Sequence, residues 1–175
     1  MIYEETDYTM FYYDIDELLN TVSTYTLINT RHSKNEAGES NTDDISLTND
    51  ESALFNKLLK KGGLEIFERV SVLSKTITDA FLFDTSDDES TSISEAGLLI
   101  YKVVLPTQWD DNISKLLDEN IESALISYVI KEWFRINGIM DRYQVENENY
   151  KTLLSKIKGN VVYRKKNVKI TYRGF

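Results

Sequence analysis

The side chains in this sequence that could do chemistry are mostly carboxylates, and their spacing matches no catalytic or metal-binding pattern. The chain has no cysteine and a single histidine, His32, which lies in a polar stretch without a partner residue. A general base or a zinc site needs further positioned groups. Phosphate-binding glycine loops and zinc-protease and serine-hydrolase motifs do not occur. We therefore expect a protein that is not an enzyme and has no cofactor, catalytic residue or metal site.

Three acidic clusters have simpler explanations than ion binding. The stretch DTSDDE at 84–89 is superficially like a calcium loop, but it lacks the glycine and the final glutamate that an EF-hand needs. The stretch DIDE at 14–17 suits the start of a helix, where carboxylates interact favourably with the helix dipole. The stretch ENEN at 146–149 is expected to be an exposed helical face.

Charge is distributed unevenly along this chain, whose net charge is −9. Residues 1–51 contain 12 acidic residues and two basic ones, whereas residues 159–175 contain five basic residues and no acidic one. The overall acidity argues against general nucleic-acid binding, which relies on Lys and Arg against phosphate. Opposite charges at the two ends suit head-to-tail contact between copies, although charged ends also serve simply to solvate a chain.

Hydropathy gives no sign of a membrane protein. No apolar run approaches the roughly 20 residues of a membrane span. The stretch MIYEETDYTM at the start of the sequence is acidic and lacks the basic-then-apolar pattern of a signal peptide. We expect a protein that is made in a cytoplasm and does not bind a membrane.

Apolar spacing predicts about four helices. The first covers 14–29 and is capped by Asp14 or Asp16. The second begins at the capping box TNDE (48–51). It continues through Gly62-Gly63, where we expect a kink or a close approach by another backbone.

The third helix, 111–137, has the strongest pattern, and it is apolar on two sides, so we place it at the centre of a bundle. The fourth runs from about 141 to 158, with Gly159 as its C-cap. Along the third helix, the first apolar stripe predicts inward side chains at Ile113, Leu116, Leu117, Ile121, Ala124, Leu125, Tyr128 and Trp133.

Two short apolar stretches, 79–84 and 97–105, predict a β-hairpin with an acidic tip. The Tyr-rich residues 1–13 look like an arm or a short strand. Residues 160–175 alternate like a strand. The expected fold is therefore mainly α: a small helical bundle at 14–159 with a β-hairpin insertion at about 79–105, an N-terminal arm at 1–13 and a C-terminal docking arm at 160–175.

Both ends of the chain contain more aromatic side chains than a solvated terminus needs, and Tyr and Arg are preferred anchors of protein interfaces. Three groups of candidate contact residues follow from this and from the acidic hairpin tip. The C-terminal docking residues are Tyr163, Arg164, Lys165, Lys166, Lys169, Tyr172, Arg173 and Phe175; the N-terminal contacts are Tyr3, Tyr8, Phe11, Tyr12 and Tyr13; and the tip residues are Asp87, Asp88 and Glu89.

The order of elements over about 48–175 resembles that of head–tail connector proteins (adaptor or head-completion proteins) of tailed bacteriophages. It is similar to those of gut Bacteroidota phages, including ring proteins of crAss-like phages. The resemblance rests on core and interface residues and includes no catalytic motif. These residues are Leu105, Pro106, Trp109 and Asp110 at a strand-to-helix step, Ala124, Tyr128, Glu132, Trp133 and Phe134 in the third helix, and Tyr172, Arg173 and Phe175 near the end.

The resemblance implies a structural virion protein that forms a ring of about twelve copies below the portal. Such a ring joins the portal to the tail or to a second ring, and it extends the channel through which packaged DNA passes without sequence-specific binding. The C-terminal residues would dock on the portal or a neighbouring copy. Asp87, Asp88 and Glu89 would face the lumen or another ring.

Two other readings stay open at this point. One is a tail-completion protein or another interaction protein of the virion. The other is an acidic inhibitor that mimics DNA, which the negative charge of residues 1–51 favours.

Overall fold

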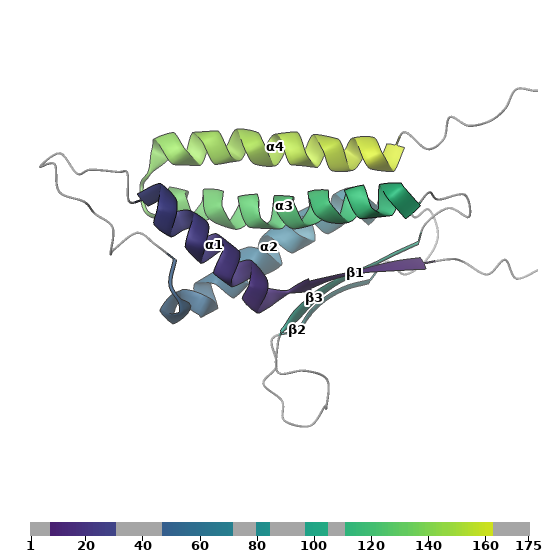
Figure 1. Cartoon of the computed structure of the whole chain (residues 1–175), viewed down its shortest axis with the longest axis horizontal. Helices are drawn as coiled ribbons and strands as arrows, with labels where there is room; N and C mark the ends of the chain where they lie inside the picture. Colours follow the sequence, from purple (N-terminus) through teal and green to yellow (C-terminus); the bar gives the residue numbers. More distant parts are fainter. Residues whose placement is uncertain (1–7, 31–46, 72–79, 85–96, 105–110, 163–175) are drawn as a thin grey trace, which may run out of the picture.

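The computed structural model describes residues 8–30, 47–71, 80–84, 97–104 and 111–162. These residues form four α-helices and a three-stranded antiparallel sheet (Figure 1). The mainly helical fold with a hairpin agrees with the sequence prediction. Along the chain the elements are β1 (Tyr8–Asp14), α1 (Ile15–Thr30), a 3₁₀ turn (Asn49–Glu51), α2 (Ser52–Ser71), β2 (Ala80–Asp84), β3 (Leu98–Val104), α3 (Asp111–Ile136) and α4 (Met140–Val162).

The first two helices begin at the predicted caps. Oδ1 of Asp14 accepts hydrogen bonds from the amides of Asp16 (2.8 Å) and Glu17 (3.1 Å), which satisfies two donors at the start of α1. Before α2, Oε2 of Glu51 accepts from the amide of Thr48 (2.9 Å). The amide of Glu51 donates to the carbonyl oxygen of Thr48 (3.0 Å), so one half of the expected capping box is present and a backbone turn replaces the other half.

Helix α3 lies at the centre, as predicted, and contacts α1, α2 and α4. Figure 1 shows α4 antiparallel to α3 on one side, with α1 and the sheet on the other. The prediction that the side chain of Leu116 points inward is wrong, because it is 47% exposed. The predicted core residues Leu117, Ile121, Leu125, Tyr128 and Trp133 are all buried.

Helix α2 continues without a break through Gly62 and Gly63. The close approach at this point comes from a side chain and not from a second backbone. A β-carbon on Gly62 would lie 2.5 Å from Cδ1 of Tyr128 on α3. Glycine at 62 therefore lets α2 and α3 pack closely around a buried aromatic ring.

Strand β3 is the middle strand, with β1 and β2 on either side. The pairing of β2 with β3 confirms the hairpin. For residues 8–13 the predicted short strand is confirmed and the alternative of an arm is wrong, because these residues form most of β1 and pair with β3. Phe11 and Tyr13 are buried in the core of their own chain, so they are not the partner contacts that we expected.

Helix α4 extends past the predicted stop at Gly159 and ends at Val162. Val161 is buried, and burial of its side chain offsets the cost of about 1 kcal/mol for a glycine inside a helix. The docking arm expected at 160–175 is therefore wrong for residues 160–162, which belong to the bundle.

Candidate interaction surface

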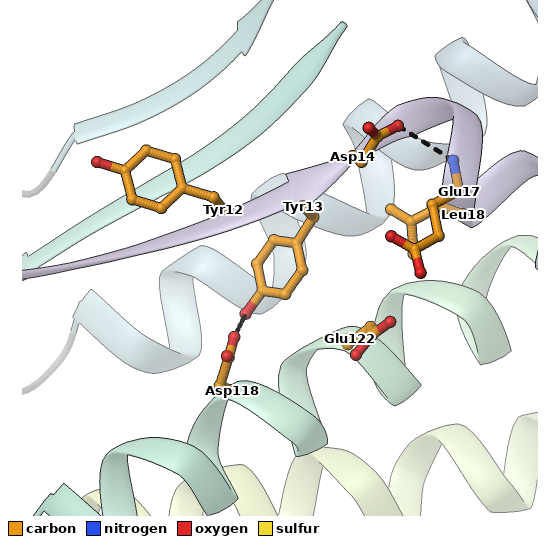
Figure 2. A pocket seen from close by; sticks show the side chains of 7 residues that line it. All are labelled: Tyr12, Tyr13, Asp14, Glu17, Leu18, Asp118 and Glu122. Carbon is orange, nitrogen blue, oxygen red and sulfur yellow. Dashed lines mark hydrogen bonds between the residues drawn. The ribbon is translucent and has the colours of Figure 1, made fainter. Parts of the chain in front are cut away.

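An acidic hollow lies where β1 passes into α1 beside the first half of α3 (Figure 2). Its volume is about 240 Å³. Side chains from three elements distant in the sequence meet there. The residues that line it are Tyr12, Tyr13 and Asp14 from the end of β1, Glu17 and Leu18 from α1, and Asp118 and Glu122 from α3.

In the acidic hollow, Tyr13 connects β1 to α3 through a hydrogen bond. Its hydroxyl donates to Oδ1 of Asp118 at 2.8 Å, and its ring packs edge-on against Tyr101, with centroids 5.8 Å apart. Burial, and then the neighbouring Asp118 carboxylate, raise the pKa of Tyr13 well above its ordinary value. Tyr13 therefore stays protonated as a hydrogen-bond donor at any physiological pH.

The carboxylates of the acidic hollow repel one another. Glu17 and Glu122 extend from facing helices (Figure 2). Partial burial, followed by the charges of Glu17, Asp118 and Glu119, raises the pKa of Glu122. Within the described ranges none of the four lining carboxylates forms an ion pair with Lys or Arg, so a cation placed there would relieve the repulsion.

A metal ion is a poor fit to the acidic hollow. The described residues contain no group of three or more His, Cys, Asp or Glu side chains that could hold a metal ion. The Asp14 carboxylate is already used as the cap of α1. The spread of the charges suits extended cationic side chains better than a single ion.

The outer edge of β1 borders the acidic hollow. The amide of Ile15 donates to the carbonyl oxygen of Gly97 (3.0 Å), and this pair continues the register in which Tyr13 lies opposite Leu99. In an antiparallel pair, residues bonded to the partner strand alternate with residues whose backbone groups point away from it. The N–H and C=O groups of Met10 and Tyr12 therefore point to the outer edge, where no described strand pairs with them.

The face of β1 that carries Met10 and Tyr12 is apolar but exposed. Tyr12 is 57% exposed and Met10 36%. The Tyr12 hydroxyl donates to the sulfur of Met10 (2.7 Å). Tyr12 lies opposite the partly buried Ile100 of β3. Because Tyr12 and Tyr13 point to opposite faces and both line the hollow (Figure 2), the hollow follows the edge of the strand.

The structure brings together few of the site residues that the sequence predicted. Tyr12 remains on the surface, and the side chain of Tyr8 falls outside the description although its backbone is in β1. The acidic hollow was missed, because its acids come from positions more than 100 residues apart. Outside the described residues lie Tyr3, the tip residues Asp87, Asp88 and Glu89, and the docking residues Tyr163, Arg164, Lys165, Lys166, Lys169, Tyr172, Arg173 and Phe175.

A second polar cluster is buried inside the bundle and serves the fold. Lys131 lies over the rings of Tyr128 and Tyr150, with Nζ 4.5 and 4.6 Å from their centroids. Its ammonium is 3.4 Å from Oε1 of Glu132, and Arg135 binds the other carboxylate oxygen of Glu132. The charges of Lys131, Glu132 and Arg135 therefore compensate one another inside the bundle.

The prediction that 146–149 is an exposed helical face is wrong for Glu146, whose side chain is buried. It accepts hydrogen bonds from the hydroxyl of Tyr25 and from that of Ser127 (3.3 Å). Through these contacts it joins α1, α3 and α4.

Comparisons with protein-family models, curated proteins and solved structures give no match. None of the helices in the described parts of the chain is both long and apolar enough to cross a membrane.

Proposed function

We propose that this protein is a structural subunit of a bacteriophage neck, assembling as a ring that joins the portal to the tail and extends the DNA channel. The observation that carries the proposal is the sequence run Ala124, Tyr128, Glu132, Trp133 and Phe134, through which the chain resembles connector proteins. All five side chains are buried on α3, where they organise the bundle.

Several features of the described residues support an assembly role. The acidic hollow and the edge of β1 offer charge, exposed aromatic surface and unpaired backbone groups, which are the means by which one chain recognises another. The buried Lys131–Glu132 pair, in contrast, is enclosed. The proposed ring would use the portal and further copies of the chain as partners, and a tail or second-ring protein below.

The DNA-mimic alternative is not supported by the described acids. Asp14 and Glu51 act as helix caps. Glu17 lines a hollow beside α3. A phosphate mimic would need regularly spaced carboxylates on an open surface.

Co-expression with the portal protein encoded in the same genome tests the proposal. We expect the affinity-tagged portal to retain this chain through gel filtration, and the mass of the complex from light scattering to show a ring with the symmetry of the portal. Retention should fall at high salt, because steering between charged surfaces is screened. A portal that never retains the chain, at low or high salt, would contradict the proposal.

A further inference from the structure

We propose that the acidic hollow and the outer edge of β1 form the docking site for the C-terminal segment (163–175) of a second copy of this chain, which adds to β1 as an antiparallel strand. The inference rests on the proposed ring and names its subunit contact. It assigns a place to the basic segment of a chain that is otherwise acidic.

Charge complementarity selects this occupant. Asp14, Glu17, Asp118 and Glu122 surround the hollow without a basic partner among the described residues. Residues 163–175 contain five basic and no acidic residues. Ammonium and guanidinium groups entering the hollow would form charge-assisted hydrogen bonds with carboxylates that now repel one another.

The alternation of the C-terminal segment matches the two sides of β1. Its sequence places Lys169, Thr171 and Arg173 on one face of a strand, and Val168, Ile170 and Tyr172 on the other. Beside β1, the side of Tyr13 carries Asp118 and Glu122 of the hollow, and the other side carries Met10 and Tyr12. A strand added there would set its basic face toward the acids and its apolar face beside the exposed apolar side chains.

Backbone groups provide the contact that holds such a strand. The N–H and C=O groups of Met10 and Tyr12 point to the outer edge of β1, and an added strand would pair with them. In the antiparallel direction, the basic cluster Arg164–Lys166 and Lys169 come first, at the Asp14 end of β1 where the hollow lies.

The reach of the chain favours a second copy as the donor of the strand. Figure 1 shows α4 ending at the same end of the molecule as the first residue of β1, with α3 between them. An antiparallel strand must enter at the far end, Asp14, about 20 Å further along. To reach that end from its own α4, the chain would have to cross the width of α3, about 10 Å, and then the length of β1. Residues 163–167 span at most about 18 Å, which is too short, so the strand must come from another copy.

A mixing experiment with two full-length charge-swapped variants tests the docking site. One variant reverses the charge of the C-terminal segment (Lys165→Glu, Lys166→Glu, Lys169→Glu) and the other reverses the charge of the hollow (Glu17→Lys, Glu122→Lys). The wild-type protein should self-associate in a concentration-dependent manner. Each variant alone should be a monomer by light scattering, because its segment and its hollow then have charges of the same sign, whereas an equimolar mixture should associate again, because both contacts between unlike variants join opposite charges.

A matched control separates the acidic hollow from net charge. Asp141 and Glu148 are exposed acids that do not line the hollow, so Asp141→Lys with Glu148→Lys changes the charge equally and should leave self-association intact. A mixture that stays monomeric overturns the docking site. Self-association of either single variant as strong as that of the wild type overturns it as well.

A labelled peptide of residues 163–175 tests strand addition separately. The peptide should bind the variant with Lys165→Glu, Lys166→Glu and Lys169→Glu, whose hollow is intact. Adding Glu17→Gln and Glu122→Gln to that variant should weaken binding of the peptide about tenfold, which corresponds to the loss of one charge-assisted contact. Two further peptides have methylated backbone amides, one at 168, 170 and 172 and the other at 169, 171 and 173. Only one of the two should lose binding, because alternate amides of a strand face its partner. Equal binding of both methylated peptides would overturn strand addition.

Failure of the docking site and failure of the ring give different results. If the hollow variant enters phage particles normally, the docking site is wrong and the ring proposal stands. If the wild-type chain is absent from particles, the ring proposal is wrong, whatever the peptide does.

Discussion

Gly62 of α2 and Tyr128 of α3 are in such close contact that a β-carbon on Gly62 would lie 2.5 Å from the tyrosine ring. The ring also contacts Tyr150, with centroids 5.3 Å apart, and Lys131, whose Nζ is 4.5 Å from the ring centroid. Tyr128 therefore has little room to yield.

Gly62→Ala should destabilise the protein although alanine favours a helix. The helix gains about 1 kcal/mol, but overpacking a core of this kind costs about 1–3 kcal/mol, and the ring cannot move away. Urea unfolding gives the difference. The same substitution in a Tyr128→Leu background should cost less, and a stabilising Gly62→Ala in the wild-type protein would show that the contact is not tight.

Trp133→Ala should cost about 3–5 kcal/mol in unfolding free energy, the range for a large aromatic side chain in a core. Trp133 is 2% exposed. Leu116 on the same helix is the matched control, because it is 47% exposed and its replacement by alanine should cost about 0.5 kcal/mol or less. Similar costs for the two variants would mean that α3 is not the centre of the core.

Glu132→Gln should destabilise the protein by about 3 kcal/mol, because it leaves the Lys131 ammonium buried without its counter-charge. Arg135 binds the same carboxylate from the surface, where its own side chain is 52% exposed, so Arg135→Gln should have a much smaller effect. Chemical denaturation of the two variants in parallel checks this order. The reverse order would place the important ion pair at the surface.

Alkaline pH should unfold the protein through its buried tyrosines. Burial raises the pKa of Tyr128 to about 12, and burial likewise raises those of Tyr13, Tyr101 and Tyr150. The unfolded chain loses these protons first, so their stabilising contribution is complete below pH 10 and declines as the pH rises toward 12. Phenolate absorbance should show these four tyrosines ionising together with unfolding; early, reversible ionisation of all tyrosines would contradict their burial.

Local patterns in the sequence predicted much of this fold. The apolar stripe of α3, the Asp14 cap and the β2–β3 hairpin each depend on neighbours a few residues apart, and such signals are readable without tertiary information. The end of α4 was not predicted correctly. Gly159 is a local signal for the end of a helix, but burial of Val161 extends the helix beyond it.

The buried face of strand β1 and the acidic hollow could not be predicted from the sequence for a different reason. In β1, Met10 and Tyr12 alternate with Phe11 and Tyr13, and all four are apolar or aromatic, so no inward face stands out. The hollow joins Tyr13 to Asp118 across 105 positions. Only the folded chain brings them together.

The proposal that this chain is a ring subunit in a phage neck is tested most directly by cryo-electron microscopy of phage particles produced from the genome that encodes the chain. The proposal predicts a ring of this four-helix fold between portal and tail, with its copies related by rotation around the DNA channel. Particles whose neck is fully accounted for by other proteins, and which contain no copy of this chain by mass spectrometry, would contradict it.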